Sequence, residues 1–118
     1  MATTETRSLD NADETRTPDK TTVEVVRLGD TELGRFTFEP GWRWSECIKP
    51  VVGTDSCQLP HVGYVVSGTI HVVGDDGTEA DVGAGDAYTI APGHDAWVVG
   101  DEPFVGIEFK SAGEYAKG

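Results

Sequence analysis

Short runs of hydrophobic residues, separated by polar turns, follow one another along the chain from Thr22 onward. The runs are rich in β-branched and aromatic residues, and glycine is present in most of the turns between them. Such runs are typical of strands, and helix signals are nearly absent. The pattern therefore predicts an all-β sandwich or barrel. The expected strands are residues 23–28, 34–39, 42–48, 61–68, 69–73, 79–82, 86–91, 96–99 and 104–109.

Residues 1–20 have a different composition, rich in Thr, Asp, Glu and Arg, with Leu9 as the sizeable apolar side chain after Met1. Such a segment buries too little surface to offset the entropy lost on ordering. We therefore expect a flexible acidic tail over residues 1–20 and one barrel domain over residues 21–118, a size that suits a single core. The alternative is an arm that swaps onto a partner subunit.

The formal net charge of the chain is −12, and its isoelectric point is about 4.4. This charge repels a phosphate backbone, so nucleic acid is not an expected partner. No stretch approaches the roughly 20 apolar residues of a membrane helix, and the N-terminus does not resemble a signal peptide, so we expect a cytoplasmic protein. The acidic residues are spread along the chain. They indicate either a halophilic protein adapted to a high-salt cytoplasm or an ordinary acidic surface.

Two glycine-bounded stretches, residues 57–68 and 85–97, carry a family resemblance. They are similar to the two signature motifs of the cupin superfamily. Gly68 matches the closing glycine of the first motif, and Gly85 and Gly93 match glycines of the second. The resemblance covers about residues 23–109 and implies a jelly-roll barrel, also called a double-stranded β-helix, with a metal site inside it.

The residues at the metal positions of the family differ from the usual ones. Counting from the motif glycines, the two histidines of the first motif fall on Asp55 and Cys57, and its glutamate falls on His61. The histidine of the second motif falls on Ala96. The resemblance therefore supports the fold more strongly than it supports the chemistry.

Strand geometry suggests a different ligand set. Cys57 and His61 share one face of an extended strand, which the resemblance implies is the barrel interior, although Pro60 can break this parity. His94 lies two positions before Ala96 and would share its face. The candidate metal ligands are thus Cys57, His61 and His94, which suit zinc and could also hold iron or copper, with one position open. The equal alternative is no metal, with a buried cysteine and two hydrogen-bonded histidines.

Four further residues are candidates for the site. Tyr88 and Asp55 could carry protons for a catalytic reaction. Trp44 and Trp97 could line the barrel mouth and bind a cofactor or small ligand, because an apolar wall beside a few polar groups is typical of a pocket. The alternative for both tryptophans is core packing or a dimer contact.

The two cysteines, Cys47 and Cys57, are expected to be free thiols, because an intracellular chain of this size neither needs nor usually keeps a disulfide. A bond between them, acting as a redox switch, is the alternative.

Two classes of function remain. The chain is either a metal-dependent enzyme acting on a small organic molecule, or a noncatalytic cupin that binds or senses a ligand without a metal. The resemblance implies a homodimer, with residues 23–28 and 34–39 as candidates for the contact.

Overall fold

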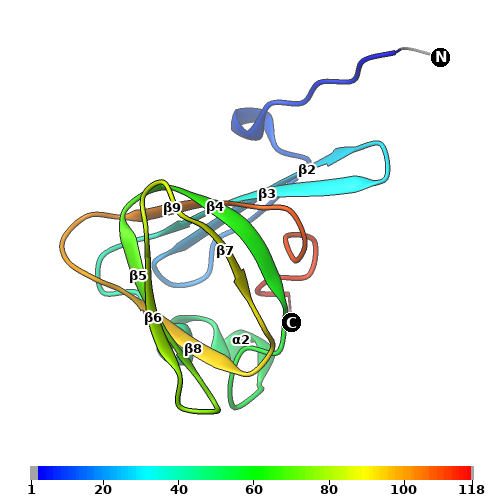
Figure 1. Ribbon diagram of the computed structural model, residues 1–118. Coiled ribbons are helices and arrows are strands. Elements are labelled where there is room, and N and C mark those ends of the chain that lie inside the picture. Colours follow the sequence, from blue (N-terminus) through cyan, green and yellow to red (C-terminus); the bar gives the residue numbers. More distant parts are fainter. Residues whose placement is uncertain (1–2, 118) are drawn as a thin grey trace.

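The computed structural model describes residues 3–117, which fold into two antiparallel sheets that face each other across a barrel (Figure 1). The strands are β1 (Glu14–Arg16), β2 (Thr21–Leu28), β3 (Thr31–Phe38), β4 (His61–Ser67), β5 (Thr69–Gly74), β6 (Glu79–Gly83), β7 (Ala87–Ile90), β8 (His94–Val98) and β9 (Phe104–Glu108). The larger sheet has the order β1-β2-β3-β9-β4-β7, and the smaller has the order β6-β5-β8. The expected all-β double-stranded β-helix is confirmed.

The strands bury alternate residues, as a barrel with one interior face requires. In β4, for example, His61, Gly63 and Val65 are buried, whereas Val62 and Tyr64 between them are exposed. Strands β8 and β9 follow the same alternation. The inward faces supply the hydrophobic core.

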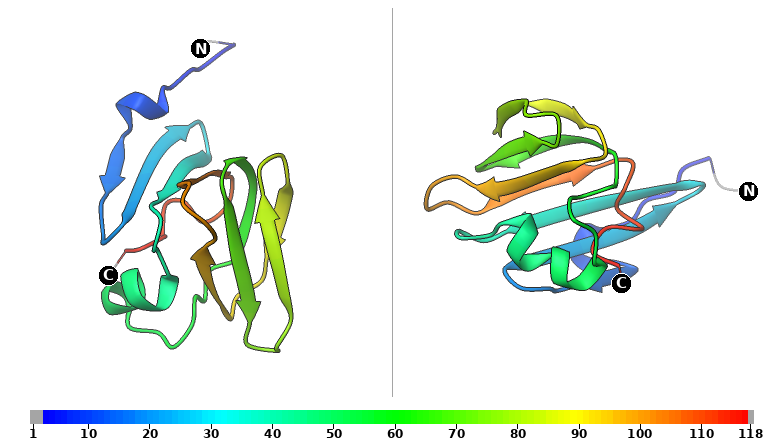
Figure 2. Two further views of the ribbon diagram at one scale, coloured as in Figure 1. Left: turned by 90° about the vertical axis from the view of Figure 1, so that its left-hand side faces the viewer. Right: turned by 90° about the horizontal axis from the view of Figure 1, so that it is seen from below.

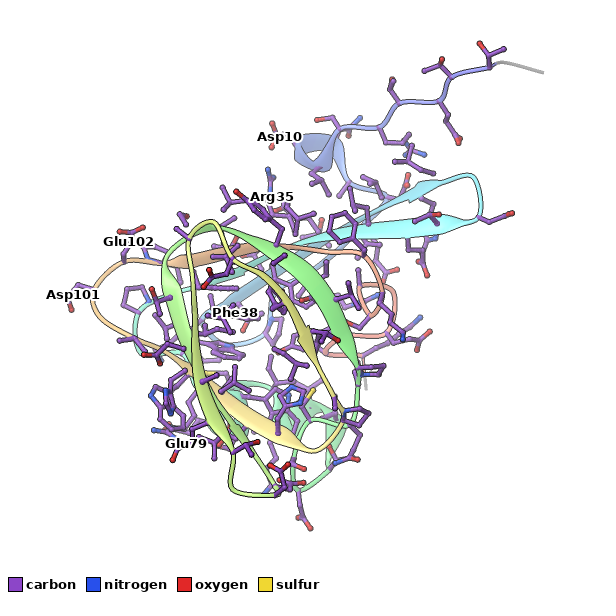
Figure 3. All side chains as sticks on the ribbon, viewed as in Figure 1. Asp10, Arg35, Phe38, Glu79, Asp101 and Glu102 are labelled. Carbon is purple, nitrogen blue, oxygen red and sulfur yellow. The ribbon has the colours of Figure 1, made fainter. Side chains whose placement is uncertain are left out.

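Aromatic rings fill one part of this core. Phe38 lies inside the barrel (Figure 3), and its ring stacks on that of Trp42 with 3.8 Å between centroids. The Trp42 ring nitrogen donates a hydrogen bond to Thr21 Oγ1 at 3.0 Å, so this buried polar group is satisfied. This packing joins the start of β2 to the connection that follows β3.

Gly68 links β4 to β5 and explains why the first motif ends in glycine. Its φ is 77°, and a Cβ there would lie 2.3 Å from the carbonyl oxygen of Pro103 and 2.7 Å from the Cα of Phe104. A side chain would therefore be strained both by its own backbone and by the neighbouring strand. The turn needs glycine for two separate reasons.

The expected strand over residues 42–48 is wrong. Two short helices, α1 (Trp44–Cys47) and α2 (Lys49–Val52), occupy this region. Trp44, Cys47 and Ile48 have the i, i+3, i+4 spacing that buries one face of a helix. Gly53 then ends α2 with a φ of 79°. These two local signals favoured a helix over the strand that the β-rich surroundings suggested.

The N-terminal region also differs from the sequence expectation. Residues Leu9–Asn11 form a short 3₁₀ helix, and β1 pairs with β2, so that Glu14 lies opposite Val25 and Arg16 opposite Val23. The sheet therefore begins before residue 21, and this arm pairs with its own chain. Residues 1 and 2, the start of the expected tail, lie outside the described residues.

Residues 111–117, which we call the C-terminal segment, follow β9 as a series of turns. Figure 2 shows that this end of the chain lies beside α2. Its buried residues include Ser111, Ala112 and Tyr115. Within residues 3–117, none of the helices is long and apolar enough to cross a bilayer.

Candidate metal centre

Cys57, His61 and His94 meet inside the barrel. Each offers a ligand atom, and these atoms all lie within 4.8 Å of one another. The Sγ atom of Cys57 is 3.6 Å from Nε2 of His61. All three residues are buried, with at most 5% of each exposed. The structure therefore brings together the three ligands that the sequence suggested.

Backbone contacts explain how these residues converge. The loop before β4 runs antiparallel to the start of β8, where the Cys57 N–H donates to the His94 carbonyl at 2.7 Å and the Gly93 N–H donates to the Cys57 carbonyl at 2.7 Å. His61 is the first residue of β4, immediately after Pro60, and it points inward. Pro60 therefore lies just before the strand, and the side chains of Cys57 and His61 both point into the barrel.

The second ring nitrogen of each histidine has a partner of its own. Nδ1 of His61 lies 2.7 Å from Glu108 Oε1 and 2.8 Å from Ser111 Oγ. Nδ1 of His94 lies 2.8 Å from the carbonyl oxygen of Ala91. Since a nitrogen facing a carbonyl or carboxylate oxygen must donate, both rings turn Nε2 toward the cluster. Carboxylate and carbonyl partners of this kind orient metal-binding histidines in proteins.

The environment of Cys57 favours a thiolate. Burial raises the pKa of the thiol, but the hydrogen bonds from His61 and His94 outweigh it and lower the pKa to about 6. Burial likewise lowers the pKa of His61, whereas its hydrogen bonds to Cys57 and Glu108 raise it to about 9. In the absence of a metal, Cys57 and His61 therefore form a thiolate–imidazolium pair at neutral pH.

Glu108, in β9, is a site residue that the sequence reasoning missed. It is 2% exposed and accepts hydrogen bonds from His61, Ser111 and the Tyr88 hydroxyl. A signal for it exists in the sequence, because Glu108 has the same parity as the buried Phe104 of its strand. Burying a carboxylate on the core face costs free energy unless it is paired, so a glutamate at such a position indicates a buried partner.

Tyr88, a predicted proton carrier, contacts Glu108, which in turn contacts His61. Its hydroxyl donates to Glu108 Oε2, and burial together with the Glu108 charge raises the pKa of the phenol well above its usual range. The group therefore stays protonated and donates a hydrogen bond, and its raised pKa makes it a weak acid. Gly63 leaves room for it, since a Cβ there would lie 2.6 Å from the Tyr88 hydroxyl.

The other predicted catalytic residue, Asp55, lies away from the cluster. Its side chain is fully exposed in the loop after α2, with the nearest cation, Lys49 Nζ, at 3.9 Å. The strand parity that grouped Asp55 with Cys57 does not apply, because the chain is not in a strand there.

The two predicted pocket tryptophans have different positions. Trp97 lies on the outer face of β8, because it follows Ala96, which points inward. The Arg43 guanidinium lies 4.1 Å from its ring centroid. Trp97 is therefore not part of the barrel interior. Trp44 is buried beside the cluster, where it lines the interior. Cys47 and Cys57 are both free thiols.

Three hollows surround the cluster. An interior cavity of about 30 Å³ is lined by His61, His94, Tyr88, Glu108 and aromatic residues. A second hollow, which we call the mouth cavity, has a volume of about 260 Å³ and is bordered by Cys57, α2 and the C-terminal segment. A groove of about 570 Å³ between β6 and β7 reaches His94 and is lined in part by acidic side chains. The interior has room for about one water, and larger molecules fit outside it.

Comparisons with known proteins support the fold. Neither a protein-family model nor a curated protein matches the chain. A protein of unknown function from Rhizobium leguminosarum bv. viciae 3841 is similar in structure, with a TM-score of 0.66 and 17% identity, over 92% of this chain and 97% of that one. A cupin-like protein from Thermotoga maritima has a TM-score of 0.53 and 19% identity, over 76% of this chain and 67% of that one. The chain has the cupin fold.

The same cupin fold occurs in a larger enzyme. Oxalate decarboxylase from Lactobacillus farciminis superposes with a TM-score of 0.63 and 15% identity, over 95% of this chain and 35% of that one. At this level of identity the likeness concerns the cupin fold alone.

Proposed function

We propose that the protein binds a divalent metal ion, most readily zinc, through Cys57, His61 and His94, and that it acts as a metal-dependent cupin enzyme on a small organic molecule. One thiolate and two imidazoles form a donor set that suits zinc, and three protein ligands leave one position open. The distance of 3.6 Å between Cys57 Sγ and His61 Nε2 suits two ligands of one zinc ion. Two such ligands of a tetrahedral zinc ion lie about 3.5 Å apart.

The observation that carries the proposal is the arrangement behind the ligands. Glu108 fixes His61 and the Ala91 carbonyl fixes His94, each through Nδ1, so that both Nε2 atoms are free to face one point. Here three ligand atoms converge in a buried space, and each imidazole is oriented from behind, as in zinc sites.

A bound zinc ion would polarise a substrate oxygen or activate a water molecule. The residues of the chain have separate tasks around it. Cys57 supplies negative charge, and Glu108 holds the Nδ1 proton of His61. Tyr88 holds a proton on its hydroxyl at the inner wall, and Ala96 is small enough to keep the interior cavity open.

A noncatalytic ligand-binding protein is the second candidate. The small interior cavity favours it, because about 30 Å³ does not admit an organic molecule beside the cluster. The thiolate–imidazolium pair also satisfies the buried groups without a metal. Turnover of a small molecule by the metal-loaded protein would decide between the two candidates.

The metal site can be tested by elemental analysis of untagged protein purified under reducing conditions. We expect about one zinc per chain, and we expect Cys57→Ala, His61→Ala and His94→Ala each to lose it. His71→Ala and Cys47→Ala are matched controls, because His71 lies on the outer face of the smaller sheet and Cys47 lies outside the cluster. Protein that takes up no zinc, iron or copper on titration would contradict the proposal.

A further inference from the structure

The C-terminal segment separates the interior cavity from the mouth cavity. Tyr115 and Trp44 line both hollows. The Tyr115 ring is 3% exposed and lies 5.6 Å from the His61 ring and 4.6 Å from the Phe36 ring, measured between centroids. Trp44 belongs to helix α1, whereas Tyr115 belongs to a segment of turns. Of the two walls, the one formed by Tyr115 is therefore easier to move.

A side chain from the other end of the chain helps to hold this segment in place, together with Ser111, which donates to Glu108 at 2.9 Å. Arg16 donates to the carbonyl oxygens of Ala112 at 3.1 Å, Gly113 at 2.8 Å and Tyr115 at 2.5 Å. The segment has few backbone hydrogen bonds of its own, so the arginine supplies a large share of its attachment. Arg16 is itself the last residue of β1, a three-residue strand at the edge of the sheet.

The mouth cavity indicates what kind of molecule would approach the cluster from this side. Its inner wall includes Cys57, and its sides are formed by the apolar residues Ile48, Val52 and Leu59. Its volume of about 260 Å³ is just below the range of drug-sized pockets, which begins at about 300 Å³. A small, largely apolar molecule suits this space.

We propose that Tyr115 is the residue that determines access to the metal site. Cys57 borders the mouth cavity but is only 3% exposed, and Tyr115 keeps small apolar molecules there from its buried thiol and from His61 and His94 until the C-terminal segment moves. Arg16 acts as a positioning residue that keeps the segment closed. Release of the short β1 strand would withdraw Arg16 and allow Tyr115 to swing away. This inference rests on the proposed function for its biological meaning, but its test requires no metal.

The test measures how fast iodoacetamide alkylates Cys57 in reduced, metal-free protein at one pH, with iodide as the leaving group. Peptide mass spectrometry reports Cys57 and Cys47 separately. In Tyr115→Ala and Arg16→Met we expect alkylation of Cys57 to accelerate at least about tenfold. For Arg16→Met this is the equivalent of losing one charged hydrogen bond. Two variants are used so that the result does not depend on one of them folding well.

Cys47 is the internal control, because it is also buried and does not border either cavity. Tyr115→Phe keeps the ring and should react like the unchanged protein. Arg43→Met removes a different arginine, which pairs with Glu46 and Asp95, and should also leave Cys57 protected. An unchanged rate at Cys57, or equal acceleration at both thiols, would overturn the proposal. Loss of zinc binding with intact gating would instead contradict the proposed function alone.

Discussion

At the scale of single residues, the site depends on one buried carboxylate. Glu108 accepts hydrogen bonds from His61, Ser111 and Tyr88, and so connects a ligand, the start of the C-terminal segment and the inner wall of the barrel. Its charge also stabilises the imidazolium form of His61 and keeps the Tyr88 phenol protonated. The chemistry of the cluster is therefore set by a residue that does not itself face the proposed ion.

We expect Glu108→Gln to weaken zinc binding by about tenfold, since partners behind a ligating histidine typically contribute 10–100-fold. The amide can still accept a hydrogen bond from His61, but the negative charge is lost. Competition with a chromogenic chelator would measure the change. Glu102→Gln, at an exposed loop position, is the control (Figure 3). Equal affinities in the two variants would show that Glu108 has only a packing role.

The thiolate of Cys57 should be observable in metal-free protein. Because the hydrogen bonds from both histidines lower its pKa to about 6, the thiol loses its proton as the pH rises through about 6. Ultraviolet thiolate absorbance should therefore appear near this pH, vanish in Cys57→Ser and persist in Cys47→Ser, whose thiol pKa burial raises instead. A transition confined to the ordinary cysteine range of about 8–9 would contradict this prediction.

At the scale of elements, turns and strand starts position the three proposed ligands. The chain reverses at Gly93 immediately before β8, and β4 starts with His61 directly after Pro60. The two histidines are therefore placed by the first residues of two strands, and Cys57 by a bridge between the loop before β4 and the start of β8. Short, well-defined turns give the ligands a fixed spacing along the barrel.

Gly68 and Gly77 allow the role of one turn to be measured. Both have positive φ, 77° and 87°, but a Cβ at Gly68 would collide with Pro103 and Phe104, whereas one at Gly77 would meet nothing within 4 Å. Gly77→Ala should cost about 1–2 kcal/mol for its backbone conformation alone. Gly68→Ala should lower the free energy of unfolding by at least about 1 kcal/mol more, because the backbone of Pro103 and Phe104 must also move. Urea denaturation would compare the two, and equal losses would exclude the steric contribution.

At the scale of the whole molecule, the surface combines a large acidic excess with one apolar strip. Acidic side chains such as Glu79, Asp101 and Glu102 lie around the periphery (Figure 3). On the outer face of β4, Val62, Tyr64 and Val66 are 40–53% exposed. The two features lead to separate predictions.

The expected homodimer remains a prediction, but the structure moves its candidate contact. The valines of β2 are all buried, Val23 and Val25 within the core, whereas the outer face of β4 offers exposed apolar side chains to a second copy. Tyr64→Glu should then shift the protein from dimer to monomer in light scattering. Glu substitution at the exposed Thr31, in the hairpin between β2 and β3 and away from this strip, is the control. A monomeric unchanged protein at micromolar concentration would contradict the prediction.

The net charge of −12 predicts that salt stabilises the fold. At 1 M salt the Debye length falls to about 3 Å, which screens the repulsion between acidic side chains. Thermal unfolding should therefore occur at a higher temperature in molar KCl than at low salt. An unchanged melting temperature would favour the ordinary acidic protein over the halophilic one.

Most strands of the barrel and the turn glycines were predictable from the sequence, because each depends on spacing within a short stretch, and the three proposed ligands were suggested by spacing together with the family resemblance. Strand parity places His94 with Ala96 without knowledge of the remaining chain. Parity also grouped Cys57 with His61, but the structure positions Cys57 through its bridge to His94, because β4 begins only at His61. The helices over residues 44–52 were missed although their signals are local, since the i, i+3, i+4 pattern is short and stands among strands.

Only the tertiary structure decided what surrounds these ligands. The partners of His61 lie 47 and 50 residues away along the chain, and Arg16 reaches a carbonyl 99 residues away. No local pattern encodes such pairings, which arise when β9, β1 and the C-terminal segment pack at one end of the barrel. Asp55 lies outside the site because the chain is not in a strand there, and Trp97 because it is one position from the inward Ala96. Local spacing therefore suggested which residues could bind a metal, and long-range packing determined their orientation and the protonation that their surroundings favour.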